Sequence, residues 1–190
     1  MPRAAPASAL VCVAVDARFL QAGDVAGLRA EAARAGADGA GGFFVSRGTL
    51  GDPFVLAAGL SLSVPRVLIG VRLGLSEDGR HPAILAREVT SLDLVCGGRS
   101  VLCFTPPFDG RLAEAIALCR ALWREGEADS TGPHFPVHAA VNRPRPAGAG
   151  GPLVALDLTG SDEPPDVLSD AADLLVHGTD DAAVGRVERT

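Results

Sequence analysis

The sequence predicts an α/β fold in which parallel strands alternate with outer helices. Two observations predict it: short runs rich in aliphatic residues recur along the chain, and amphipathic helical patterns separate them. The stretch 67–108 contains a complete strand, helix, strand unit, with strands at 67–73 and 100–104. Two parallel strands joined by one helix are the smallest α/β module, and such a module places its chemistry at the carboxyl ends of the strands.

The central helix of this unit has clear start and stop signals. His81-Pro82 opens it, with proline at the first helical position, where the missing N–H costs nothing. Apolar residues then recur at three- and four-residue steps up to Val95, and Gly97-Gly98 supplies the left-handed residue that ends a helix. The pattern predicts a helix over 82–95.

The other elements are predicted from the same signals, in chain order. Asp52-Pro53 opens a short helix that is apolar on nearly every side, which indicates burial against something beyond its own sheet. Asp109 caps an amphipathic helix. The predicted strands are 9–15, 42–45, 153–158 and 174–177, and the predicted helices are 24–35, 54–62, 111–124 and 166–172.

The segment 126–152 holds five of the 14 prolines and several glycines, so it predicts a long connection with one extended arm at 137–141. His134 and His138 are four residues apart, as on a metal-binding helix, but Pro133 and Pro136 exclude that helix. We therefore expect no metal site.

The composition restricts the classes of function. The chain of 190 residues has a net charge of −6, and all 17 of its basic residues are arginine. Because the arginines are scattered, we expect no nucleic-acid partner. Transmembrane-length apolar runs and the apolar core of a signal peptide are missing, so we expect a cytoplasmic protein without a membrane partner. Enrichment in alanine, glycine and arginine indicates a bacterial origin.

The four cysteines occur without any CxxC pair, which argues against a zinc ribbon and against a thioredoxin-like site. Cys103 lies near the carboxyl end of a predicted strand, where a reactive thiol could sit. Buried reduced thiols are the favoured interpretation for Cys12, Cys96, Cys103 and Cys119.

Six short motifs in a fixed order carry a resemblance to a known family. They are Asp52–Ala58, Arg80-His81-Pro82, Leu85–Glu88, Leu92-Asp93, Gly97–Arg99 and the pair of segments Arg111–Ala115 and Ala121–Trp123. Together they resemble the luciferase-like monooxygenases, the superfamily of bacterial luciferase and the F420-dependent oxidoreductases. The resemblance covers residues 9–160 and makes this chain a shortened, divergent relative.

The resemblance implies a TIM-barrel-like fold, but 190 residues are short for a (β/α)8 barrel of about 250. We therefore expect a truncated or incomplete barrel formed by one domain, residues 1–190. Its βα units occupy 9–126, a Pro/Gly-rich insertion occupies 127–152, and 153–190 form a shortened C-terminal part. The sequence from Gly178 to Arg186 resembles the family's C-terminal helix start without its proline.

The resemblance also implies FMN or F420 as cofactor and locates candidate contacts at strand ends. After the third strand, Arg72-Leu73 falls where the family has a bulge and a non-prolyl cis peptide against the flavin. Relatives have a small residue where Arg72 stands, so its side chain either fills part of the flavin pocket or pairs with a phosphate or carboxylate. The turn Thr159-Gly160-Ser161 either cradles a cofactor phosphate or is a plain polar turn.

Two strand ends depart from the family pattern. Where F420-dependent relatives have an acidic residue and a catalytic histidine, this chain has Ser46-Arg47, and arginine cannot replace imidazole as an acid or base near neutral pH. Where relatives have a glycine-rich turn, it has Thr105-Pro106-Pro107-Phe108, a stiffer wall for a ligand. Catalytic residues stay unknown, and the candidate cofactor contacts are Ser46, Arg72, Leu73, Thr105, Thr159 and Ser161.

Two functions follow as hypotheses. The first is a luciferase-like flavin- or F420-dependent oxidoreductase or monooxygenase. The second is a non-catalytic binding or subunit-partner protein that has lost the cofactor site and binds none. In the family, the helices that correspond to 54–62 and 82–95 pack across a two-fold interface, so we expect a homodimer or hetero-oligomer through them.

Overall fold

The computed structural model describes residues 10–15, 25–46, 51–160, 164–178 and 184–189. Its strands are β1 (Leu10–Val15), β2 (Gly42–Ser46), β3 (Leu68–Gly74), β4 (Ser100–Thr105), β5 (Glu127–Ser130), β6 (Val137–Val141), β7 (Leu153–Asp157), β8 (Leu174–Gly178) and β9 (Val184–Arg189). Its helices are α1 (Val25–Ala37), α2 (Pro53–Ser61), α3 (Leu75–Asp78), α4 (Pro82–Cys96), α5 (Gly110–Glu125) and α6 (Asp166–Ala171).

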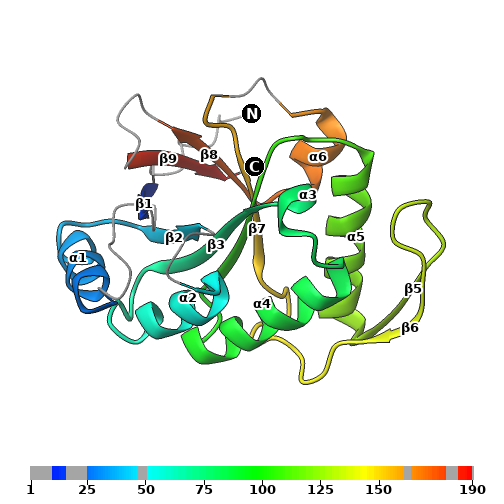
Figure 1. Cartoon of the computed structure of the whole chain (residues 1–190), viewed down its shortest axis with the longest axis horizontal. Coiled ribbons are helices and arrows are strands. Elements are labelled where there is room, and N and C mark those ends of the chain that lie inside the picture. Colours follow the sequence, from blue (N-terminus) through cyan, green and yellow to red (C-terminus); the bar gives the residue numbers. More distant parts are fainter. Residues whose placement is uncertain (1–9, 16–24, 47–50, 161–163, 179–183, 190) are drawn as a thin grey trace, which may run out of the picture.

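The main sheet closes on itself as a barrel in the order β1-β2-β3-β4-β7-β8-β9 (Figure 1). The strands β1, β2, β3, β4, β7 and β8 run parallel, each to the next one in this order. The prediction of a shortened TIM-barrel-like fold, with parallel strands and outer helices, is confirmed. The barrel has fewer parallel strands than the eight of a complete (β/α)8 fold.

The circuit is closed by β9, which runs antiparallel to both β8 and β1. The expectation that the C-terminal segment starts a helix, as in the family, is wrong for Val184 and Arg186, because both lie in this strand. The physical reason is the shortened barrel: β8 and β1 would otherwise present unpaired backbone edges, and a strand satisfies both of them.

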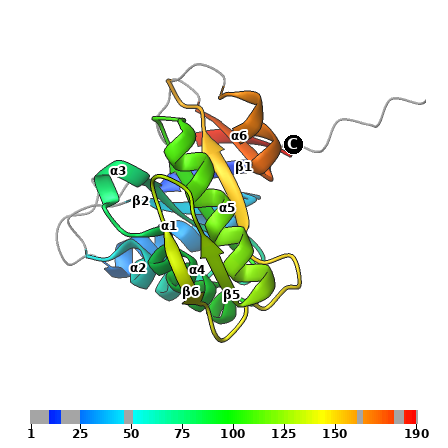
Figure 2. The same cartoon turned by 90° about the vertical axis from the view of Figure 1, so that its right-hand side faces the viewer.

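The helices cover the outside of the barrel, with α2, α4 and α5 on one side of the sheet (Figures 1 and 2). A large apolar core fills the space between this side of the sheet and the helices, and Leu85 and Trp123 contribute to it from α4 and α5. The indole of Trp123 donates a hydrogen bond to the backbone oxygen of Ala86, 3.0 Å away, which ties the two helices together.

The predicted helix starts are found in the structure. The carboxylate of Asp109 accepts a hydrogen bond from the N–H of Leu112 at 3.0 Å, and the imidazole Nδ1 of His81 accepts one from Ala83 at 3.2 Å. Gly97 ends α4 with a φ of 69°, a conformation that favours glycine.

The proline-rich connection contains more regular structure than the sequence predicts. Its expected arm is β6, and β5 pairs with it in an antiparallel ribbon beside α5 (Figure 2). The carboxylate of Glu114 on α5 accepts the backbone N–H groups of His134 and Phe135 at the turn of this ribbon. Phe135 is buried, with its ring against His81 and under the guanidinium of Arg111.

Inside the barrel lies a second, smaller apolar cluster. Its buried members come from alternate positions of the strands and are Phe44, Val101, Cys103, Ala155, Leu174 and Val176. Gly70 on β3 provides the room for the Phe44 ring, because a Cβ atom at position 70 would lie 2.2 Å from Cδ1 of Phe44. The lower interior is therefore a packed core rather than a channel.

Among the described residues, no helix is long and apolar enough to cross a membrane.

Candidate functional site

Four polar residues lie at the carboxyl ends of neighbouring barrel strands. Ser46 is the last residue of β2 and pairs in register with Arg72 of β3. Thr105 ends β4, and Asp157 ends β7. In a strand the side chains alternate between faces, and these positions continue the inward-facing alternation of Phe44, Cys103 and Ala155. They define a polar layer above the apolar interior, which we call the mouth of the barrel.

An ion pair spans the mouth. The Nε atom of Arg72 contacts Oδ2 of Asp157, and the side chain of Asp157 is only 3% exposed whereas that of Arg72 is 28% exposed. The atoms are close enough for a charge contact, although Arg72 Nε does not meet the geometry of an aligned hydrogen bond. The other oxygen of Asp157 accepts the N–H of Thr159 at 2.9 Å. The buried carboxylate is thus held by the chain, and it orients the guanidinium.

Ser46 and Thr105 bring hydroxyl groups to the same layer. The Oγ atom of Ser46 is buried and has no hydrogen-bond partner in the described structure. Thr105 lies beside the end of β3, since a Cβ atom at Gly74 would be 3.1 Å from the Thr105 hydroxyl and 3.3 Å from a carboxylate oxygen of Glu77. A buried hydroxyl without a partner is costly, so it points to a bound group that would satisfy it.

The structure thus brings three of the candidates from the sequence together: Ser46, Arg72 and Thr105. Leu73 does not join them, because its side chain is buried in the core between the sheet and the helices. Thr159 is exposed and takes part through its backbone N–H, while Ser161 lies outside the described residues.

The family's local geometry at Arg72-Leu73 is not found. The cis peptide bonds of the described residues are at Pro106-Pro107 and Arg143-Pro144, and the register between β3 and β4 is unbroken through this point. The sequence allowed Arg72 to fill a pocket or to pair with an anion, and in the structure it pairs with a carboxylate of its own chain.

Asp157 is the residue of the mouth that the sequence analysis missed. A signal was available: it is the single charged residue in the apolar run Leu153–Leu158, and a charge in a buried strand requires a partner. What the sequence could not supply was the identity of that partner, since β3 and β7 are neither sequential nor adjacent in the barrel.

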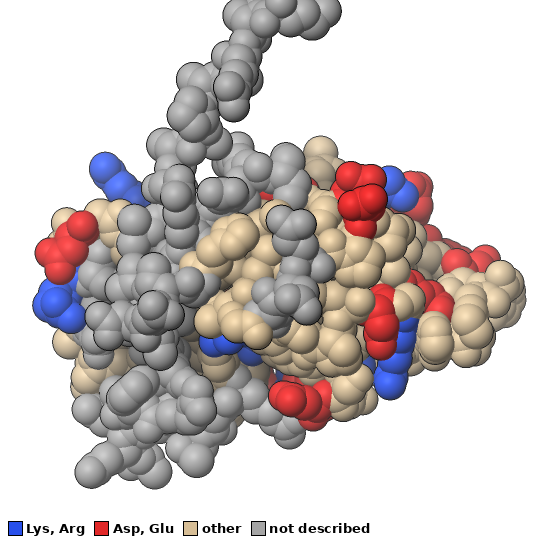
Figure 3. Space-filling view, turned by 90° about the horizontal axis from the view of Figure 1, so that it is seen from above, with Lys and Arg blue, Asp and Glu red and all other residues tan. Residues whose placement is uncertain are grey.

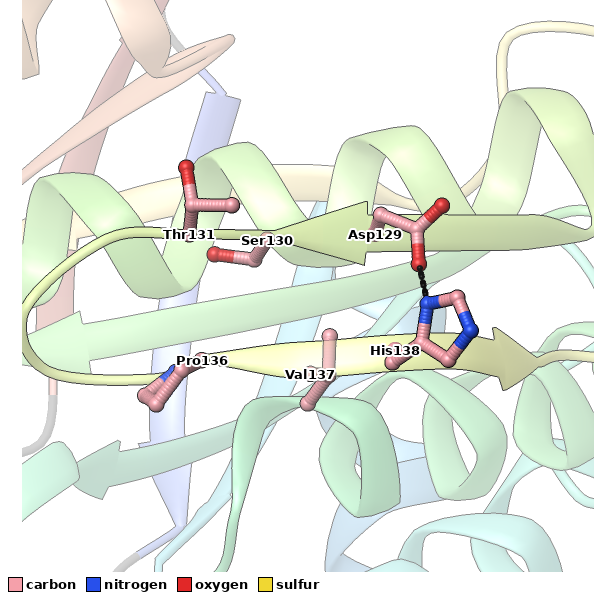
Figure 4. Close-up of a pocket in the computed structure, with 6 residues that line it drawn as sticks. All are labelled: Asp129, Ser130, Thr131, Pro136, Val137 and His138. Atoms are coloured by element: carbon pink, nitrogen blue, oxygen red, sulfur yellow. Dashed lines mark hydrogen bonds and ion pairs between the residues drawn. The ribbon is translucent and has the colours of Figure 1, made fainter.

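A hollow lies away from the mouth, on the β5–β6 ribbon, with a volume of about 600 Å³ (Figure 4). Within it, the imidazole Nδ1 of His138 lies 2.8 Å from Oδ1 of Asp129. A hydrogen bond from the N–H of Ala139, followed by the contact with His138, lowers the pKa of the Asp129 carboxyl. The imidazole is 94% exposed, so the pair is solvated and supplies no water-excluded chemistry.

Neither the histidines of the ribbon nor the cysteines form a metal centre or a reactive site in the described part of the chain. His134 and His138 belong to no group of three or more metal-ligating side chains there. Cys96, Cys103 and Cys119 are buried and form no disulfide bond, and burial raises the pKa of Cys119 to about 12. A thiol with a raised pKa is a poor nucleophile.

Charged groups of both signs occur around the rim of the face seen in Figure 3. One cluster joins the start of α2 to α4: the guanidinium of Arg80 contacts the Asp52 carboxylate and lies 3.3 Å from Glu88. It also lies over the ring of Phe54, 5.2 Å from its centroid. The groups lie within ion-pair distance of one another, although Nη1 of Arg80 and Oε2 of Glu88 make no hydrogen bond in the described structure. The cluster therefore ties the start of α2 to α4 through charge contacts.

Several solved structures that are similar in fold to this chain are named as reductases or monooxygenases. The chain superposes on the coenzyme F420-dependent tetrahydromethanopterin reductase from Methanopyrus kandleri with a TM-score of 0.68 and 14% identity, covering 90% of this chain and 56% of that one. For the EDTA monooxygenase from Chelativorans the TM-score is 0.63 at 22% identity, covering 80% and 46%. For the FMN complex of 3,6-diketocamphane monooxygenase from Pseudomonas putida it is 0.57 at 14%, covering 76% and 50%.

These likenesses confirm, at the level of fold, the resemblance to luciferase-like monooxygenases and F420-dependent oxidoreductases. No protein-family model matches the chain, and no curated protein matches it. The chain spans about half the length of the solved structures it matches, 46 to 56% of the three above.

Proposed function

We propose that this chain is an oxidoreductase-type barrel that binds FMN or F420 at its mouth. The observation that carries the proposal is the polar layer of Ser46, Arg72, Thr105 and Asp157 at the carboxyl ends of the parallel strands. This is the end at which barrels of this architecture bind their ligands. The FMN complex and the F420-dependent enzymes among the structural neighbours support the choice of cofactor.

The residues of the mouth fit such a cofactor in their chemistry. FMN and F420 both carry hydrogen-bonding ring edges and a phosphate group, and these need donors. The buried hydroxyl of Ser46 lacks a partner, and the guanidinium of Arg72 is partly exposed. When bound, the cofactor would supply hydride transfer, or in the case of FMN activation of oxygen.

The chain's own contribution would be to bind and to orient. Asp157 fixes Arg72, Arg72 and Ser46 donate hydrogen bonds, and the packed interior around Phe44 excludes water from below. In the sequence, Arg47 stands where F420-dependent relatives have their histidine, and Ser46 stands where they have the acidic residue. Proton transfer by an imidazole is therefore not part of the proposal.

The proposal is tested by titrating FMN and F420 into the purified protein and following quenching of cofactor fluorescence. We expect stoichiometric binding of one of the two, weakened about tenfold in Ser46→Ala because a hydrogen bond to a buried group is lost. Gly59→Ala, on the outer helix α2 with nothing within 4 Å of the new Cβ, serves as the matched control. Failure of both cofactors to quench would contradict the proposal.

A second function is favoured by a different observation. Large apolar side chains are exposed on α2 and α4. Val55 lies in the first turn of α2 and Leu62 just after the end of α2. Ile84 lies in the first turn of α4, and Leu94 and Val95 lie in its last turn. Exposed apolar surface of this kind is typical of a binding face. As an alternative, we propose a non-catalytic subunit partner, in which the barrel binds no cofactor and α2 and α4 mediate assembly as homodimer or hetero-oligomer.

A further inference from the structure

Arg72 is engaged on one side only. Asp157 contacts the guanidinium at Nε, and neither terminal nitrogen has a partner among the residues that the structure describes. A guanidinium has five N–H donors in a rigid plane, one on Nε and four on the terminal nitrogens. The fork formed by the two terminal nitrogens therefore stays available for a second group.

The fork is also held in place. The carboxylate of Asp157 is 3% exposed and is itself fixed by the N–H of Thr159, so the guanidinium is anchored at the side that faces β7. The Arg72 side chain is 28% exposed, which leaves its free side in contact with the mouth. An arginine fixed in advance loses less conformational entropy on binding than a mobile surface arginine.

A hydroxyl group lies on the strand beside Arg72. Ser46 pairs in register with Arg72 on the adjacent strand, and neighbouring strands are about 4.8 Å apart, so both side chains leave the same face of the sheet. The Ser46 hydroxyl is buried and has no partner in the described structure. Two planar guanidinium donors and one hydroxyl donor match a carboxylate or a phosphate, which accept bidentate hydrogen bonds from arginine.

We infer that the Arg72 fork, together with the Ser46 hydroxyl, is a subsite for an oxyanion, either the phosphate of the cofactor or a carboxylate of the substrate. The inference rests on the proposed function for the identity of the bound molecule. Asp157 neutralises the charge of Arg72, so the subsite selects by hydrogen-bond geometry more than by net charge. Asp157 is accordingly a positioning residue that acts through Arg72.

The subsite is tested first with simple anions, independently of any cofactor. Inorganic phosphate and benzoate are titrated into the wild-type protein while the guanidinium Nε–H resonance of Arg72, assigned by its loss in Arg72→Gln, is followed by NMR. We expect saturable shifts with one or both anions. Arg72→Lys keeps the charge but removes the fork, and we expect it to bind at least tenfold more weakly than wild type.

Arg120→Gln is the matched control, because Arg120 is 27% exposed and pairs with Asp173 at 2.9 Å, on α5 outside the barrel. It should bind the anions like the wild type. Asp157→Asn should leave the Arg72 fork intact but remove the carboxylate that holds it in place. We expect its affinity for the anions to lie between those of the wild type and Arg72→Lys. Circular dichroism spectra of all variants verify that they are folded, and Arg72→Lys keeps the test open if Arg72→Gln does not fold.

Comparing FMN with riboflavin, which lacks the phosphate, distinguishes the two anion sources. If the fork binds the cofactor phosphate, wild type should prefer FMN at least tenfold and Arg72→Lys should lose that preference. If it binds a substrate carboxylate, FMN and riboflavin should bind equally while benzoate binding depends on Arg72. Anion binding without cofactor binding would contradict the proposed function alone. Anion binding that is absent, or equal in wild type and Arg72→Lys, would overturn the subsite.

Discussion

At the scale of single residues, Glu88 shows how burial and charge compete within one cluster. Its carboxylate lies 3.3 Å from the guanidinium of Arg80, on the half-buried flank between α2 and α4. Burial nevertheless outweighs this attraction and raises the pKa of Glu88 from 4.5, with Asp52 and Asp78 adding to the rise. The folded protein therefore binds a proton at Glu88 more tightly than the unfolded chain does.

The sign of the effect on stability follows from this difference. A raised pKa in the folded state favours folding in acid, and the benefit disappears as the pH rises from 4.5 through the folded-state pKa. We expect Glu88→Gln to be at least as stable as the wild type at pH 7, because Arg80 keeps Asp52 as a partner, and to lose this advantage at pH 4. Urea unfolding at the two pH values measures it.

Asp38→Gln is the control for this experiment, since its ion pair with Arg34 is 3.7 Å long and both side chains are about 70% exposed. We expect an effect within about 0.5 kcal/mol at both pH values. A Glu88→Gln variant that is clearly less stable than wild type at pH 7 and equal to it at pH 4 would show that the attraction to Arg80 prevails instead.

Individual residues of the mouth were predictable where a local rule applies. Arg72 stands out because it is the one charged residue in an otherwise apolar strand and lies near its carboxyl end, where such folds place ligands. Its pairing with Asp157 was not predictable, because it depends on the closure of a barrel between residues 85 positions apart. The direction of Leu73 follows from the alternation of a strand once Arg72 is known to face inward.

At the scale of elements, β2 and β3 pack closely because the large Phe44 side chain of β2 lies against Gly70 of β3, which has no side chain. Phe44 is 2% exposed, and its ring lies over Gly70 of the adjacent strand. Gly70→Ala would place a Cβ 2.2 Å from Cδ1 of Phe44, so one of the two strands must shift. We expect a loss of stability of about 1–3 kcal/mol, measured by urea unfolding.

Two further variants isolate the cause. Gly59→Ala introduces the same methyl group where nothing lies within 4 Å, within α2, and we expect a gain of up to about 1 kcal/mol. Combining Gly70→Ala with Phe44→Leu should recover part of the loss, because the shorter side chain makes room. Strictly additive effects of the two substitutions would argue against the contact as the cause.

Elements with local signals were predictable, and elements defined by their partners were not. Capping residues and apolar periodicity located α2, α4 and α5 to within one or two residues. By contrast, β5 is polar and short, with the sequence Glu-Ala-Asp-Ser, and exists because β6 pairs with it. In the same way, β9 is a strand because β8 and β1 both have edges to satisfy.

At the scale of the whole molecule, closure by β9 changes what the barrel exposes. An open circuit would present two strand edges, and those edges would favour association through backbone pairing. With the edges of the main sheet paired, the exposed apolar side chains of α2 and α4 are a feature of the described residues that favours association. Val55 is 70% and Leu62 73% exposed, while Ile84 and Val95 are each 51% exposed.

We expect these two helices, which pack on each other, to form a dimer interface through their exposed apolar side chains, with Val55 and Ile84 among them. Val55→Glu combined with Ile84→Glu should convert a dimer to a monomer, because two carboxylates per subunit would be desolvated at the contact. Light scattering during gel filtration measures the mass, which for one chain is 19.3 kDa.

Val167→Glu is the matched control, since Val167 is 63% exposed but lies on α6, away from both helices. It should remain dimeric if the interface is formed by α2 and α4. A wild-type protein that stays monomeric at the highest soluble concentration would contradict the homodimer, leaving assembly with a different chain as the form of the subunit-partner hypothesis. The same samples, titrated with FMN and F420, show whether assembly and cofactor binding occur together, because the expected interface lies on the outer helices and the mouth lies at the strand ends.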